Sequence, residues 1–150
     1  MSVQPISVRP FHVAFPVRDL AETRYFYETI LGCSIGRTSD RWIDFNLFGH
    51  QVTAHLCDSM PSVPTNLVDG QQVPVQHWGV ILAMADWQTL ADSLQEKGVA
   101  FVIKPYIRFK GEVGEQATLF LLDPSGNALE FKAFQQDKAI FATDLDNPGS

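Results

Sequence analysis

The sequence predicts an α+β fold made of two copies of one strand–helix–strand–strand–strand module. Three observations predict it: landmarks that recur at a fixed spacing, an alternating strand before each helix, and short strand-like runs after it. The repeated landmarks lie 65, 67 and 66 residues apart: His12 and His77, Asp19 and Asp86, Gly32 and Gly98. A sheet of this size cannot cover its own apolar face. We therefore expect the two modules to pack together or to pair edge to edge.

The first module spans about 9–57. Its opening strand, 11–17, alternates so that the apolar side chains face a helix and His12 points to the opposite face of the sheet. Asp19 is the expected N-cap of that helix, with Glu22 three residues later as in a capping box, and Gly32 is its expected end. Two short strands are expected to follow, at 42–47 and 52–56.

The second module spans about 75–135 and repeats this plan. A strand is expected at 77–83, then a helix capped by Asp86 and closed by Gly98. The apolar side chains of this helix share one face: Trp87, Leu90, Ala91 and Leu94. Strands are expected at 100–103, 119–122 and 128–134, with a hairpin turn at 123–127.

The remaining segments are interpreted by composition. Residues 58–74 are rich in Pro, Gly and polar residues and are expected to link the modules. Residues 136–150 are expected to form an acidic tail. The two modules, the linker and the tail are together interpreted as a single domain, 1–150. Residues 104–118 break the repeat as an insertion, either a lid with glycine hinges or a plain solvated hairpin.

Charge and composition exclude several classes of function. The net charge is −6 and the pI is near 5.0, so the basic footprint of a nucleic-acid binder and the charge that favours anionic membranes are both lacking. No apolar run approaches the length of a membrane span, and 1–10 carries no apolar signal region. Cys33 and Cys57 form no CxxC motif and are expected to be free thiols. These features predict a cytoplasmic protein.

Four polar residues interrupt strands that are otherwise apolar. Alternation places His12, His77 and Glu130 on one face, and His55 also points away from its apolar neighbours. His12 matches His77 in the repeat, and His55 roughly matches Glu130. Two histidines and a carboxylate form a facial triad for Fe(II) with open positions. His55 is either a fourth ligand, which suits Zn²⁺, Ni²⁺ or Fe²⁺, or an acid/base near neutral pH.

The sequence resembles the vicinal oxygen chelate superfamily, which includes glyoxalase I, bleomycin-resistance proteins and extradiol dioxygenases. The likeness covers about 9–135 and is carried by several motifs: 12–19 (HVAFPVRD), Phe26-Tyr27, Leu31-Gly32, His77, Gly98-Val99 and 122–131 (LDPSGNALEF). Within the superfamily, 41–50 and 108–111 resemble bacterial proteins predicted to be dioxygenases of the extradiol type.

The resemblance implies two βαβββ modules that form an open, cup-shaped mixed sheet around a divalent metal, with the helices outside. It implies His12, His77 and Glu130 as metal ligands. Glyoxalase I usually has a Glu where this chain has His55, and some extradiol dioxygenases place a catalytic His near that position. The resemblance also implies a homodimer, in which the modules pair within one chain or across two.

Three functions follow as hypotheses. The first is an extradiol-type dioxygenase with Fe(II), acting on a small catechol-like or other vicinal-dioxygen substrate, with His55 moving protons. The second is a glyoxalase-like lyase, isomerase or hydrolase in which all four residues bind the metal; bound Zn or Ni would favour it, whereas Fe or Mn would favour the first. The third is a metal-free, resistance-type protein that binds a small molecule in a cup lined by aromatic side chains: Trp42, Phe45, Trp78 and Phe120. Arg108 and Lys110 are candidates to bind a substrate carboxylate.

Overall fold

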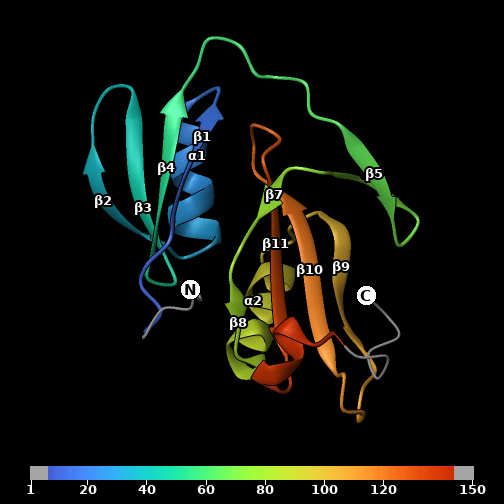
Figure 1. Cartoon of the computed structure of the whole chain (residues 1–150). Helices are drawn as coiled ribbons and strands as arrows, with labels where there is room; N and C mark the ends of the chain where they lie inside the picture. Colours follow the sequence, from blue (N-terminus) through green and yellow to red (C-terminus); the bar gives the residue numbers. More distant parts are fainter. Residues whose placement is uncertain (1–6, 144–150) are drawn as a thin grey trace, which may run out of the picture. The chain divides into compact units, whose positions relative to one another are not determined.

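The computed structural model describes residues 7–143 and divides the chain into two compact units, Met1–Met60 and Pro61–Ser150 (Figure 1). Each unit contains a strand, a helix and further strands in one sheet, which confirms the predicted α+β fold of two βαβββ modules. The start of the chain, 1–6, and most of the expected acidic tail, 144–150, lie outside the described residues. None of the helices within 7–143 has the length and apolar character of a membrane span.

The first unit forms a four-stranded sheet in the order β1-β4-β3-β2. Its elements are β1 (His12–Val17), α1 (Leu20–Arg24), a π-helical continuation of that helix (Tyr25–Ile30), β2 (Ser34–Thr38), β3 (Trp42–Leu47) and β4 (His50–Leu56). Strands β1 and β4 are parallel, and the other neighbours are antiparallel.

The helix of the first unit begins as the sequence predicts. The Asp19 carboxylate accepts a hydrogen bond from the backbone N–H of Glu22 at 2.8 Å, and the Glu22 carboxylate forms an ion pair with Arg18. Gly32 follows the helix with a φ of +82°, a left-handed conformation that glycine adopts without strain.

The apolar face of the first sheet packs under this helix. Tyr27 is fully buried, with its ring 5.4 Å from that of Phe15 and 4.9 Å from that of Phe45. Phe45 is therefore a core residue under the helix, and the expectation that it lines a cup is wrong. Cys33 is a buried free thiol, and its burial raises the pKa to about 12.

The second unit repeats the topology, with the order β7-β11-β10-β9 and with β8 also paired to β11. Its elements are β5 (Thr65–Val68), β6 (Gln71–Pro74), β7 (His77–Trp78), β8 (Ile81–Leu82), α2 (Met84–Glu96), β9 (Phe101–Arg108), β10 (Gln116–Leu122), β11 (Ala128–Phe134) and a 3₁₀ turn (Asp137–Phe141). Strands β7 and β8 run parallel to β11, as β1 does to β4.

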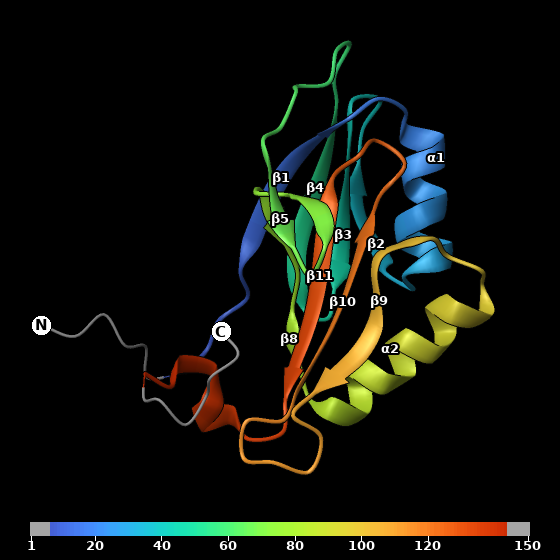
Figure 2. The same ribbon diagram turned by 90° about the vertical axis from the view of Figure 1, so that its right-hand side faces the viewer.

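Helix α2 lies on one face of this sheet, and the four side chains predicted for its apolar face are all buried (Figure 2). The indole N–H of Trp87 donates a hydrogen bond to the Phe131 carbonyl at 3.0 Å, which ties the helix to β11. The N-cap is Ala83, so the prediction of Asp86 as the cap is wrong. Asp86 lies in the first turn, where an acidic side chain still stabilises the helix dipole.

The strand predicted at 77–83 is interrupted in the structure. It forms two short pieces, β7 and β8, on either side of Gly79. A Cβ atom on Gly79 would lie 1.7 Å from the Glu130 carbonyl oxygen, so only glycine lets the two backbones approach this closely.

Two segments have more regular structure than the sequence suggested. The expected linker, 58–74, contains the two-stranded hairpin β5–β6. The insertion, 104–118, mostly extends β9 and β10, leaving 109–115 as the connecting loop. Of the two interpretations of that insertion, the structure therefore shows a long hairpin.

Candidate functional site

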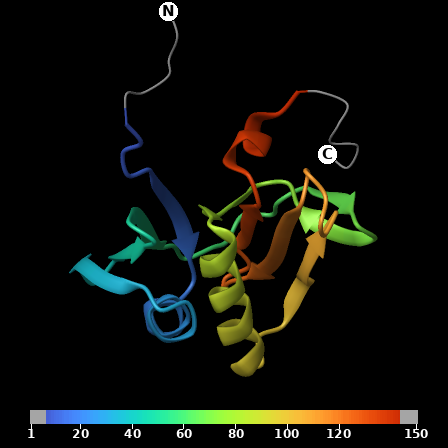
Figure 3. The same cartoon turned by 90° about the horizontal axis from the view of Figure 1, so that it is seen from below.

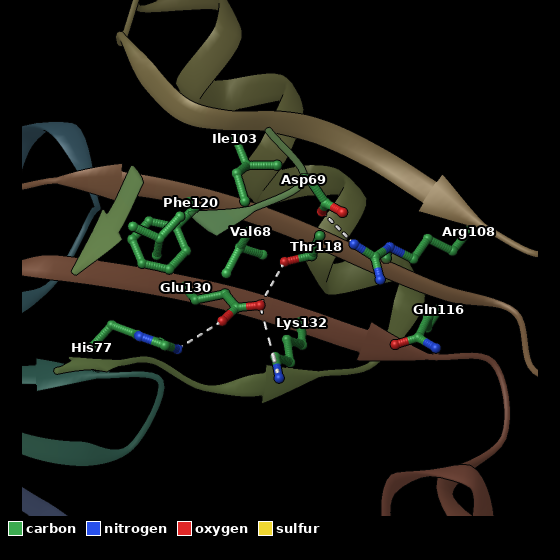
Figure 4. Close-up of a pocket in the computed structure, with 12 residues that line it drawn as sticks. Val68, Asp69, His77, Ile103, Arg108, Gln116, Thr118, Phe120, Glu130 and Lys132 are labelled. Atoms are coloured by element: carbon green, nitrogen blue, oxygen red, sulfur yellow. Dashed lines mark hydrogen bonds and ion pairs between the residues drawn. The ribbon is translucent and has the colours of Figure 1, made fainter. Parts of the chain in front are cut away.

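A pocket of about 300 Å³ lies in the second unit, on the face of the sheet opposite to α2 (Figure 4). Strand alternation builds it: Thr118 and Phe120 of β10 and Glu130 and Lys132 of β11 line the pocket. The intervening residues are buried toward the helix: Leu119, Leu121, Leu129 and Phe131. The prediction that Glu130 points away from Leu129 and Phe131 is thus confirmed.

The hairpin β5–β6 lies beside β9 (Figure 3), and three of its residues line the pocket: Val68, Asp69 and Val73. Val73 of β6 is buried in a cluster with Ile103, Phe120 and Ala128 from the sheet. Phe120, one of the aromatic residues expected to line a cup, does line the pocket. The hairpin is therefore anchored by apolar packing, and the pocket has an apolar wall.

His77 and Glu130 face each other at one end of the pocket. The imidazole Nε2 of His77 lies 3.1 Å from Oε2 of Glu130, and its Nδ1 lies 3.0 Å from the carbonyl oxygen of Pro74. A carbonyl only accepts, so Nδ1 carries a proton, and in a neutral ring Nε2 then presents a lone pair. Two electron-pair donors 3.1 Å apart need a cation between them, either a proton or a metal ion.

The Glu130 carboxylate is held in place by two further contacts. The Thr118 hydroxyl donates a hydrogen bond to its Oε1 at 2.9 Å, and the Lys132 ammonium lies 3.8 Å from the same oxygen. The side chain is only 17% exposed, so these partners contact most of what the carboxylate presents. An imidazole whose second nitrogen binds a carbonyl, beside an oriented carboxylate, has the character of a metal-ligand pair.

The pair supplies two ligands, fewer than a metal site normally uses. Among residues 7–143, no group of three or more His, Cys, Asp or Glu side chains is close enough to hold a metal ion. His12 and His55, the other residues predicted to serve the metal, belong to the first unit.

Within the first unit, His12 and His55 share a face but not a position along it. Residue pairing in the parallel ladder sets His12 beside Gln51, and His55 lies four residues further along β4. That separation is about 13 Å along the strand direction. A backbone separation of this size argues against one metal ion bound by both His12 and His55 within this unit.

The same pairing corrects the expected match between His55 and Glu130. His12 pairs with Gln51, and His77 pairs with Ala128. Two residues beyond these partners lie Thr53 in the first unit and Glu130 in the second. Thr53 is therefore the counterpart of Glu130.

Asp69 and Arg108 line the other end of the pocket, and the Tyr106 hydroxyl contacts both of them. Asp69, at the tip of the β5–β6 hairpin, accepts a hydrogen bond from the Tyr106 hydroxyl at 2.7 Å and forms an ion pair with Arg108. The hydrogen bond from Tyr106 and the charge of Arg108 lower the pKa of Asp69. Lys110 is exposed in the loop and is not among the residues that line this pocket.

Sequence reasoning missed Asp69, Tyr106 and Thr118. Thr118 was recoverable, because it is two residues before Phe120 and so shares its face. Asp69 also had a signal in the sequence, because Asp69-Gly70 is a dipeptide typical of hairpin turns. Tyr106 carried no signal of its own, since an irregularity in the β9–β10 pairing shifts its register.

Comparison with known proteins agrees with this architecture. The family model described as the glyoxalase/bleomycin resistance protein/dioxygenase superfamily matches residues 9–131. No curated protein matches the chain. A glyoxalase/bleomycin resistance protein/dioxygenase from Alicyclobacillus acidocaldarius is 31% identical, covering 93% of this chain and 100% of that chain, with a TM-score of 0.72.

Two more distant structures are also similar. An integron cassette protein from the mobile metagenome of a Halifax Harbour sewage outfall is 26% identical, with a TM-score of 0.60 over 83% of this chain and 97% of that chain. The fosfomycin resistance protein FosX from Listeria monocytogenes is 15% identical, with a TM-score of 0.64 over 92% and 99% of the two chains, and shows a shared fold. With a family model that spans most of its length, this chain belongs to the glyoxalase/bleomycin resistance protein/dioxygenase superfamily.

Proposed function

We propose that the protein is a metal-dependent dioxygenase of the extradiol type, with Fe(II) bound by His12, His77 and Glu130. The observation that supports this most is the His77–Glu130 pair, in which Nε2 and Oε2 lie 3.1 Å apart while Pro74 and Thr118 orient the two side chains. Two imidazoles and one carboxylate leave coordination positions open for substrate and O₂.

His12 is proposed as the third ligand because of its place in the repeat. His12 begins β1 as His77 begins β7. Strand β1 runs parallel to β4, and β7 runs parallel to β11. The proposal requires a first unit, of the same chain or of a second copy, to bring His12 to the His77–Glu130 pair. The homodimer and the cytoplasmic location stay predictions.

The substrate in this proposal is a small molecule with two adjacent oxygens, such as a catechol. A bound divalent metal supplies a site for both oxygens and lowers the pKa of a coordinated hydroxyl. Phe120, Ile103 and Val68 give the pocket an apolar wall that holds the ring and excludes water. Thr118 keeps the Glu130 carboxylate oriented. His55 is proposed to move protons, since its position along β4 argues against a role as a ligand beside His12.

Oxygen consumption tests this function. The protein is loaded with Fe(II) without oxygen, and uptake is followed after catechol is added. We expect uptake by the wild type, none by Glu130→Ala, and full uptake by Glu96→Ala, an exposed glutamate at the end of α2. His55→Asn should lower kcat and leave bound iron unchanged. Bound metal without oxygen uptake would contradict the dioxygenase and favour a lyase or isomerase, whereas a protein that binds catechol but no metal would favour a binding protein.

A further inference from the structure

The end of the pocket farthest from His77 carries a cation suited to a carboxylate. Arg108, at the end of β9, lines the pocket, and its side chain is 28% exposed. Its guanidinium donates a hydrogen bond to the Tyr106 hydroxyl and pairs with Asp69. A guanidinium presents several donors in a planar fork that matches the two oxygens of a carboxylate.

The carboxylate that now meets Arg108 comes from the hairpin and not from the sheet. Asp69 lies between β5 and β6 with a φ of +49°, a left-handed conformation uncommon for a residue other than glycine. Its side chain is 40% exposed at the tip of the hairpin. The hairpin itself is held on the sheet by the buried Val73, so Asp69 can leave Arg108 without undocking β6.

The two ends of the pocket lie well apart along the strands. Glu130 is paired with Phe120 on β10, whereas Arg108 is paired with Gln116, four residues earlier on the same strand. This corresponds to about 13 Å along the strand. Phe120 and Ile103 line the pocket at the level of Glu130, and Thr118 lies between that end and Arg108, as Figure 4 shows.

We propose that Arg108 and Tyr106 form a subsite for a carboxylate of the pocket's ligand, and that Asp69 fills this subsite when the ligand is absent. The substrate class is then an aromatic or aliphatic carboxylic acid whose anionic group lies opposite the end that meets His77 and Glu130. The identity of that other end as a pair of metal-binding oxygens rests on the proposed function. The carboxylate subsite does not, because its residues and their contacts are separate from the metal ligands.

Replacing Asp69 by a ligand carboxylate leaves the guanidinium of Arg108 paired with one negative charge. A ligand carboxylate replaces the Asp69 carboxylate as the partner of the guanidinium, and Asp69 moves into solvent. The cost of binding is the loss of the Asp69 contacts with Arg108 and Tyr106. Removing the charge of Asp69 should therefore strengthen the binding of a carboxylate and leave the binding of a neutral ligand unchanged.

The test uses two probes of nearly the same shape, 3-phenylpropanoate and its neutral analogue 3-phenylpropanamide. Neither has adjacent oxygens, so their binding needs no metal and no O₂. Affinities are measured by calorimetry on the full chain after metal removal. The variants are Asp69→Asn, Arg108→Gln, Arg108→Lys and the control Asp58→Asn. Asp58 is an exposed aspartate 4.0 Å from Arg41, in the first unit and outside this pocket.

In the wild type we expect the carboxylate to bind more tightly than the amide, and in Asp69→Asn we expect this preference to grow about tenfold. Arg108→Gln should abolish the preference, Arg108→Lys should retain only part of it, and Asp58→Asn should behave as the wild type. Thermal unfolding of each variant checks that the fold is intact.

Three results would overturn the subsite. They are equal affinity for both probes in Asp69→Asn, a preference that survives Arg108→Gln, and no binding of either probe. Equal affinities with a large loss of stability in Asp69→Asn would assign the Asp69–Arg108 pair to a permanent brace of the hairpin. Because the probes are expected to bind without metal, none of these results depends on whether the protein consumes oxygen in the presence of catechol.

Discussion

Glu130 is the residue on which the account of the site depends most. It receives a hydrogen bond from Thr118, lies near Lys132 and faces Nε2 of His77. Its side chain is 17% exposed, so its contacts are mainly with these few neighbours and not with water. The residue next to it in the chain, Phe131, is completely buried under α2. A single strand thus holds a carboxylate on one face and core packing on the other.

Thr118→Val tests how much of the metal affinity comes from this orientation. The substitution keeps the shape of the side chain and removes the hydroxyl that donates to Glu130 Oε1. We expect Fe(II) affinity, measured anaerobically by calorimetry, to fall about tenfold, as is typical when a partner of a metal ligand is lost. Thr89→Val is the control, because the Thr89 hydroxyl binds only its own helix at Ala85. Equal affinities in the two variants would show that Thr118 does not position the carboxylate.

Alternation along a strand predicts which face a side chain occupies but not where along the strand it lies. Glu130 was placed correctly because Leu129 and Phe131 fix the face of β11. The predicted match between His55 and Glu130 is wrong, because the residue that corresponds to Glu130 in the first unit is Thr53. A shift of two residues preserves the face and moves the side chain about 6–7 Å along the strand, so a period of two cannot detect it.

Among the elements, β7 and β8 determine how His77 meets β11. The two pieces flank Gly79, whose backbone contacts that of Glu130 so closely that a methyl group has no room. The sequence shows a glycine inside a strand, which indicates a bulge or a close approach without saying which one. The partner of that approach, the Glu130 backbone, is 51 residues away in the chain and was not predictable from local pattern.

Gly79→Ala should therefore destabilise the second unit. The added Cβ would lie 1.7 Å from the Glu130 carbonyl oxygen, which forces β7 away from β11. We expect a loss of about 3 kcal/mol in the free energy of unfolding, measured with urea. Gly36→Ala is the matched control in β2, because its Cβ would meet Asp44 at an ordinary 3.4 Å, and we expect a change within about 0.5 kcal/mol. Equal stability of the two variants would show that the close approach to the Glu130 backbone does not require glycine at position 79.

Element boundaries were predicted well where a local signal exists. The Asp19 cap and the positive φ of Gly32 and Gly98 agree with the sequence, because capping depends on residues close in the chain. The helix start at Asp86 was wrong, since Ala83 gives no side-chain signal as a cap. The hairpin β5–β6 was interpreted as a linker because its composition is polar, although Asp69-Gly70 is a strong turn signal.

Across the whole chain, the spacing of repeated landmarks carried the most information. It predicted two modules, and the structure gives two units with matching strand order and matching parallel pairs. The boundary between the two units also separates the expected metal ligands, with His12 in the first unit and His77 and Glu130 in the second. The sequence could not supply the contacts of Asp69 with Arg108 and Tyr106, because these residues come from a hairpin and a strand that local pattern does not connect.

The most direct test is the metal content of the protein after anaerobic loading with Fe(II), with Mn, Zn and Ni as alternatives, measured by mass spectrometry. We expect about one equivalent in the wild type and in His55→Asn, and a loss of metal in both His12→Ala and Glu130→Ala. His12→Ala is decisive because its side chain belongs to the other unit. Full metal content in His12→Ala, or a wild type that retains none of the four metals, would contradict the proposed site.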